Sequence, residues 1–176
     1  MLCLLGFAFS MIAGYYLGDK ISVALLEELT GGLPDLEGIN IVQLFFFIVY
    51  NNVTKSFLWM VLGIIGGIPP IFFVVLNGFF IGHFSYNVAL DYSLGFIAAA
   101  LIPHGVVEIP AILLSSAVGM GLGYALINRL RGQGSLRAEF GKALLLFLTK
   151  ILPLLVFAAV LEVILTPLVM LFLGFV

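Results

Sequence analysis

Long apolar runs with few charged side chains constrain this chain more than any other feature. The runs lie near residues 1–18, 44–66, 69–90, 94–127 and 143–176. Hydrophobic residues make up 63% of the chain and charged residues 9%, too little polar surface to cover a soluble domain of 176 residues. We therefore expect an integral membrane protein. Its crossings must be helices, because lipid offers no partner to a free backbone amide or carbonyl.

The predicted fold is all-α, a polytopic membrane helix bundle that forms one domain over residues 1–176. Five crossings are expected near 1–18, 44–66, 69–90, 94–127 and 151–175. The apolar stretch from Met1 lacks the basic region of a cleaved signal, so we interpret it as the first crossing and not as a processed signal. The net charge of -2 argues against a nucleic-acid partner, and the single cysteine, Cys3, excludes an internal disulfide.

Two of the runs are too long for one crossing. As one helix, residues 94–127 would measure about 50 Å, whereas a crossing needs about 30 Å. Pro103 and Pro110 predict where this run breaks, because each removes a backbone donor and disfavours helix in the residue before it. We expect a non-helical, re-entrant stretch at 103–109 and a new helix that opens at Pro110. In the last run, 140–150 is expected to lie along the interface before a crossing that begins near Pro153.

The connections predict a hairpin and an orientation. Gly66, Gly67, Pro69 and Pro70 favour a tight turn followed by a helix start. Basic residues cluster in 129–142, whereas the loop at 19–40 is acidic and is expected to hold a surface helix at 21–29. We therefore predict a multi-pass protein of the plasma membrane with a cytoplasmic N-terminus and an external C-terminus.

A shift of 41 positions aligns two halves of the chain, each with the pattern Ile-Pro-x-Ile followed by a glycine pair. This pattern is consistent with an inverted repeat, which several transport folds use. Glycines four apart allow helix backbones to approach closely. Packing inside one chain is the favoured interpretation, and a homodimer through these faces is the alternative. The pairs are Gly63 and Gly67, Gly78 and Gly82, and Gly119 and Gly123.

Ionisable side chains inside apolar runs are the candidates for a functional site, because they are costly in lipid. Glu108 precedes Pro110 and is expected to cap the helix that opens there. The alternative joins His104 and Glu108 as a metal or proton site, but no third ligand lies nearby in sequence, so no metal and no cofactor are predicted. Glu162 is expected inside the bundle, either as a neutral hydrogen-bonding strut or as a carrier of protons or cations.

The other polar residues of the runs receive structural roles. The amides of Asn51, Asn52 and Asn77 are expected to hydrogen-bond the irregular stretch 103–109. Lys55 is expected either to extend to an interface or to pair with a buried acid. His83 and Asp91 are expected at the surface. Since no nucleophile elbow, phosphate-binding loop or zinc-protease motif is present, we do not expect an enzyme.

The block Pro103-His104-Gly105-Val106-Val107-Glu108-Ile109-Pro110-Ala111 resembles the stage II sporulation protein M family. The resemblance extends to the asparagine pair, the glycine-proline hairpin and Glu162 before Thr166-Pro167. It implies a five-helix membrane protein. In spore-forming bacteria it implies a scaffold that holds peptidoglycan-degrading enzymes at the septum. The family's motif residues fall on Asn51, Asn52, Asn77, Gly78, Pro103, His104, Gly105, Glu108, Pro110 and Glu162.

The function predicted from these features is a non-enzymatic membrane scaffold whose partners are the lipid bilayer and other membrane or envelope proteins. The alternative is a small transporter or channel subunit that uses Glu108 and Glu162. A cavity that leads to either acid would favour the transporter, and a dry core with both acids capped would favour the scaffold.

Overall fold

The computed structural model describes residues 1–21 and 38–175, and these residues contain helices and no strand. α1 (Leu2–Tyr16) is followed by α3 (Ile41–Leu62), α4 (Ile68–Asp91) and α5 (Leu94–Leu130). The chain ends in one continuous helix, Leu136–Phe172, which we call the C-terminal helix. The surface helix expected at 21–29 falls almost entirely outside the described residues.

The C-terminal helix contains two π-helical turns. Its segments are α6 (Leu136–Leu146), η1 (Phe147–Ile151), α7 (Leu152–Val160), η2 (Leu161–Leu165) and α8 (Thr166–Phe172). Each π turn ends two residues before a proline, Pro153 or Pro167. The helix therefore continues through Pro153, where the sequence predicted the start of a separate crossing.

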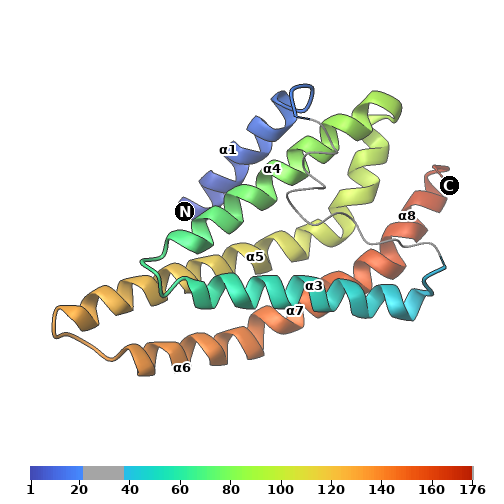
Figure 1. Cartoon of the computed structure of the whole chain (residues 1–176). Helices are drawn as coiled ribbons and strands as arrows, with labels where there is room; N and C mark the ends of the chain where they lie inside the picture. Colours follow the sequence, from blue (N-terminus) through green and yellow to red (C-terminus); the bar gives the residue numbers. More distant parts are fainter. Residues whose placement is uncertain (22–37, 176) are drawn as a thin grey trace.

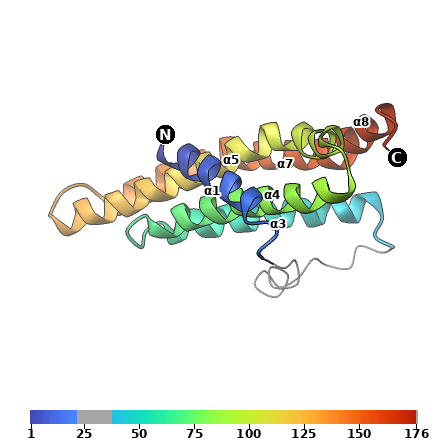
Figure 2. The ribbon, with the colours of Figure 1, turned by 90° about the horizontal axis from the view of Figure 1, so that it is seen from above.

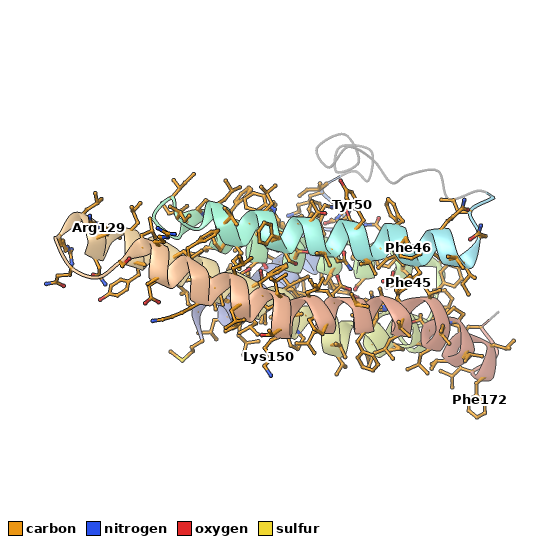
Figure 3. The ribbon with its side chains drawn as sticks, turned by 90° about the horizontal axis from the view of Figure 1, so that it is seen from below. Phe45, Phe46, Tyr50, Arg129, Lys150 and Phe172 are labelled. Atoms are coloured by element: carbon orange, nitrogen blue, oxygen red, sulfur yellow. The ribbon has the colours of Figure 1, made fainter. Side chains whose placement is uncertain are left out.

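Among the described residues, four helices are long and apolar enough to cross a membrane: α3, α4, α5 and the C-terminal helix. α1 is apolar but has 15 residues, or about 22 Å. α3, α5 and the C-terminal helix run side by side, and α1 packs along α4 (Figures 1 and 2). The exposed surface of α3 carries large apolar side chains such as Phe46 and Tyr50, as a lipid-facing surface requires (Figure 3).

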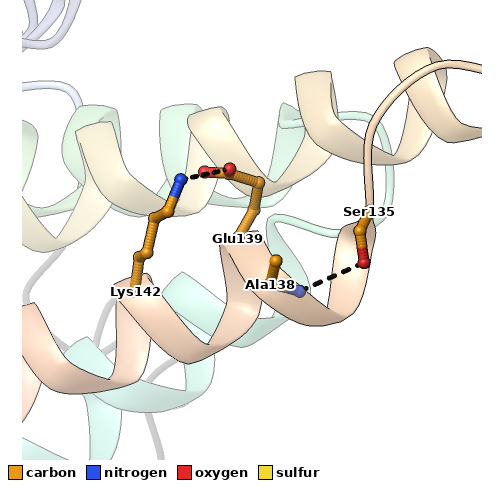
Figure 4. Close-up of polar contacts among 4 residues, drawn as sticks. All are labelled: Ser135, Ala138, Glu139 and Lys142. Carbon is orange, nitrogen blue, oxygen red and sulfur yellow. Dashed lines mark hydrogen bonds and ion pairs between the residues drawn. The ribbon is translucent and has the colours of Figure 1, made fainter.

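The hairpin between α3 and α4 has the predicted glycine geometry. Gly66 and Gly67 adopt positive φ angles of 65° and 76°, which L side chains rarely adopt, and α4 begins at Ile68 with prolines in its first turn. Three helices begin at a polar side chain that accepts from a free amide: Asn40 on α3, Ser93 on α5 and Ser135 on α6. Figure 4 shows the last of these beside the ion pair between Lys142 and Glu139, whose atoms lie 2.7 Å apart.

The predicted break at 103–110 is wrong, because α5 is helical from Leu94 to Leu130 with Pro103 and Pro110 inside it. Each proline leaves one carbonyl without its helical donor, but packing against neighbouring helices keeps the helical path. Instead of breaking, α5 changes direction near these prolines (Figure 1). Since no helix begins at Pro110, the predicted cap by Glu108 is wrong as well.

The glycine pairs pack inside the chain. A Cβ on Gly119 would lie 2.7 Å from Pro70 Cγ and 2.9 Å from Met60 Cα, so α5 touches the α3–α4 hairpin backbone to backbone. A Cβ on Gly63 or Gly123 would collide with the same contact, and Gly67 lies against Met120. Gly78 and Gly82 face the backbone of α1 in the same way. These faces are occupied within one chain, as the favoured interpretation expected, which leaves them unavailable for the alternative, a homodimer.

One row of six buried residues in the C-terminal helix recurs every four positions, with Ala158 also buried beside the row, and this repeat accounts for its π turns. An α-helix turns about 100° per residue, so a residue four positions on lies about 40° around the helix axis from the first. Over five such steps the row moves about 200° around the axis, away from the buried face. Each π turn inserts one extra residue and resets the drift by about 100°, so two π turns keep the buried residues on one face. The residues are Ala143, Phe147, Ile151, Leu155, Ala159 and Val163.

Candidate functional site

His104 and Glu108 lie between the two prolines of α5. Because α5 is helical there, their spacing of four places both side chains on the same face. Both are half-buried. The irregular backbone expected at 103–109 would not have fixed this arrangement, and that expectation is wrong.

Glu162 joins them from the second π turn of the C-terminal helix. One donor atom from each of His104, Glu108 and Glu162 lies within 4.8 Å of the others. We call these three residues the His-Glu-Glu cluster. Next to Glu162, Ala159 and Val163 pack against Ile48 in the first half of α3. The cluster therefore lies alongside an apolar membrane-length helix and not at its end.

Thr166, one turn beyond Glu162, orients the histidine. Its hydroxyl donates to the carbonyl oxygen of Leu161 at 3.4 Å, and its oxygen lies 3.5 Å from His104 Nδ1. With the hydroxyl proton directed at Leu161, the oxygen can accept from Nδ1 in the tautomer that carries its proton there. This arrangement leaves Nε2 of His104 as the nitrogen with a free lone pair.

Within the described ranges, 1–21 and 38–175, no protein donor bonds the carboxylate of Glu108 or Glu162. In the same ranges the ion pair between Lys142 and Glu139 is the only one. Two acids without a basic partner in an apolar bundle are unusual, because such residues normally pair with each other or with a cation. The cluster thus offers two carboxyl groups and an imidazole nitrogen, the ligand types of a cation site.

A cavity of about 210 Å³ reaches the cluster from the side of α1 and α4. His104, Gly105 and Glu108 contribute one wall, and Phe7 and Asn77 lie on the others. A cavity that leads to a buried acid was the feature expected to favour the transporter.

The asparagines do not act as predicted. Asn77 donates to the carbonyl of Phe73 on its own helix at 2.7 Å, and Asn51 donates to Asn52 at 3.1 Å. Since 103–109 is helical, there is no irregular stretch for these amides to bond, and that prediction is wrong. Asn77 nevertheless lines the cavity beside His104 and Glu108.

Two of the remaining ionisable residues lie at the surface and one is buried. Lys55 and Asp91 are exposed. His83 is 4% exposed, so the prediction of a surface position is wrong. It is buried because α1 packs on this face of α4, and its ring stacks on Phe79 with Nε2 3.0 Å from Asn87 Nδ2.

The family model described as stage II sporulation protein M matches residues 2–167. The chain belongs to this family. An uncharacterized protein of Methanocaldococcus jannaschii is 29% identical over 170 residues, which cover 95% of this chain and 93% of that protein. No solved structure matches the chain.

The match to the sporulation protein M family covers the whole His-Glu-Glu cluster. Sequence reasoning overlooked Thr166 as the residue that orients His104, and it could not join Glu162 to a residue 54 positions earlier. The run around Glu162 is apolar on all sides, so the sequence carried no signal for the π turn that holds it.

Proposed function

We propose that this protein is a small membrane transporter or channel component that takes a cation, either a proton or a metal ion, at the His-Glu-Glu cluster. The observation that carries the proposal is the meeting of His104, Glu108 and Glu162 within 4.8 Å. Ionisable residues in membrane helices commonly mark ion pathways and proton relays. The proposed activity moves an ion and converts no substrate, so it is not enzymatic.

The cavity beside the cluster supports this proposal. It gives an ion a path to Glu108 and His104 from between α1, α4 and α5. Two acids without an ion-pair partner among the described residues suit a cation when they are ionised, and such acids would destabilise a purely structural apolar bundle. Prolines in both helices that carry the cluster are a further feature common in transport proteins.

The proposed topology has five crossings in the plasma membrane, with α1 as the first. The N-terminus, the α3–α4 hairpin and the α5–α6 connection lie toward one end of the molecule, and the C-terminus lies at the other (Figure 1). Arg129 lies at the first of these ends and Phe172 at the second (Figure 3). The basic residues of 129–142 support a cytoplasmic location for the first end.

The test is an ion-flux measurement on the full chain in liposomes, with a proton-sensitive dye and a zinc-sensitive dye read in parallel. We expect flux of one of these ions above that of empty liposomes. Glu108→Gln and Glu162→Gln should each reduce it at least about tenfold while the protein stays folded. Glu139→Gln removes an exposed acid on the C-terminal helix and is the matched control. Wild-type vesicles that leak no faster than empty ones would refute the proposal, as would unchanged flux in both glutamine variants.

A scaffold is the second candidate, and a different part of the molecule favours it. The α5–α6 end extends past the α3–α4 hairpin (Figure 1), and its exposed basic side chains suit an acidic partner. They are Arg129, Arg131, Arg137 and Lys142. Complementation of a deletion strain separates the candidates. A scaffold predicts that the triple Arg→Gln variant fails and Glu162→Gln succeeds, and a transporter predicts the reverse.

A further inference from the structure

We propose that the His-Glu-Glu cluster binds one divalent transition-metal ion of the zinc class, an inference that rests on the proposed cation function and names its ion. One imidazole nitrogen and two carboxylates form a ligand set that zinc accepts. Mg²⁺ and Ca²⁺ prefer all-oxygen sites with six or more ligands, and the imidazole of His104 makes the cluster a poor match for them.

The distances suit a site that closes on its ion. Ligand atoms at about 2.0–2.2 Å from a tetrahedral zinc lie about 3.3–3.6 Å from one another. The donor atoms of the cluster lie within 4.8 Å of one another before any ion is present. A further approach of about 1 Å is within the reach of side-chain rotation in two glutamates, so no helix needs to move.

The charge of the cluster favours a divalent ion. When both are ionised, Glu108 and Glu162 bring two negative charges together, and the described residues supply neither an ion-pair partner nor a hydrogen-bond donor to either acid. Protonation of one acid would remove the repulsion between the two. It would not provide a single partner for the three ligand atoms of His104, Glu108 and Glu162. A divalent cation neutralises both acids and uses all three donors.

Thr166 prepares the histidine to act as a ligand. Metal-binding histidines usually hold one ring nitrogen through a hydrogen bond, which fixes the tautomer and turns the other nitrogen toward the metal. Here Nδ1 of His104 lies 3.5 Å from the Thr166 oxygen, which leaves Nε2 for the ion. The π turn therefore supplies the ligand Glu162, and the residue after it supplies the group that orients His104.

The cavity provides room for the remaining coordination positions. Its volume of about 210 Å³ is several times that of a water molecule, about 30 Å³ in the liquid. Asn77 lines it, and its amide nitrogen is already bonded to Phe73, which leaves its carbonyl oxygen free to accept from a metal-bound water. Three protein ligands with an open fourth position are typical of zinc sites that also bind water or another ligand.

The test is zinc binding to the purified full-length protein in detergent, measured by titration calorimetry and by metal analysis after dialysis. We expect one zinc per chain. Glu162→Gln and His104→Ala should each weaken binding at least about 100-fold, and Thr166→Val, which removes the acceptor for Nδ1, should weaken it about 10–100-fold. The control Glu139→Gln should bind as the wild type does. Circular dichroism and gel filtration confirm that each variant is folded.

Two results would overturn the inference: a wild-type protein that binds no zinc, or folded Glu162→Gln and His104→Ala variants that bind as tightly as the wild type. Comparison with the flux assay separates this inference from the proposed function. Proton flux through a protein that binds no zinc refutes the metal and leaves the cation function standing. Zinc binding without any flux supports the metal and refutes the transport function.

Discussion

α5 and the C-terminal helix have the same length, 37 residues, and each contains two prolines, but their backbones respond differently. α5 stays α-helical through Pro103 and Pro110 and changes direction (Figure 1). The C-terminal helix widens into a π turn just before Pro153 and again before Pro167. Proline alone therefore does not determine the local geometry.

The spacing of buried residues explains the difference. From Ala111 to Gly123, the buried positions of α5 follow steps of three and four, which average to the α-helical period. In the C-terminal helix one row of buried residues advances by four at every step from Ala143 to Val163, with Ala158 buried beside it, and an uninterrupted α-helix cannot keep such a row on one face. The packed neighbours set the register, and the prolines favour the positions at which the extra residues are accommodated.

The largest expected effect concerns the four-residue repeat. Leu155 is fully buried and Leu154 is 37% exposed. Leu155→Ala should lower the free energy of unfolding by about 2–5 kcal/mol through the cavity it leaves. Leu154→Ala is the matched control and should cost clearly less. Unfolding in detergent by denaturant measures both, and equal losses would break the proposed register of the C-terminal helix.

A second pair tests the close packing of α5. Gly119 touches the α3–α4 hairpin, and a Cβ on Gly121 would meet no atom within 4 Å. Gly119→Ala should destabilise the protein by about 1–3 kcal/mol through overpacking. Gly121→Ala, two residues away, should stabilise it by up to about 1 kcal/mol because alanine favours helix. Melting temperatures of the two variants measure the contrast, and a Gly119→Ala variant as stable as wild type would refute the backbone contact.

The smallest effect is expected for removal of a proline. If packing sets the π turn, Pro167→Ala should keep it, change the free energy of unfolding by less than about 1 kcal/mol, and leave zinc affinity and ion flux near wild type. Pro110→Ala on α5 is the comparison variant. A folded Pro167→Ala protein without zinc binding would mean that the proline, and not the buried repeat, produces the π turn.

Much of the fold was predictable from the sequence, because apolar runs and turn residues act locally. The runs predicted the helices, and Gly66, Gly67, Pro69 and Pro70 predicted the hairpin. The break at 103–109 was the main error. The prediction treated Pro103 and Pro110 by their local effect, whereas tertiary packing keeps the helix continuous.

The sequence identified the residues of the candidate site but not that they meet. His104, Glu108 and Glu162 stand out as ionisable residues in apolar runs, but their meeting depends on the packing of α5 against the C-terminal helix. The extra residue of the second π turn also changes the direction of Glu162 by about 100° relative to a regular helix. A local reading of the sequence at Glu162 contains neither piece of information.

Anomalous diffraction at the zinc edge from crystals grown with zinc tests the central claim, that the two long helices together build one cation site. The account predicts a single strong peak within the apolar bundle, about 2 Å from Nε2 of His104 and from one carboxylate oxygen each of Glu108 and Glu162. A map in which Glu162 points away from α5, or in which zinc binds only at the surface, would contradict it.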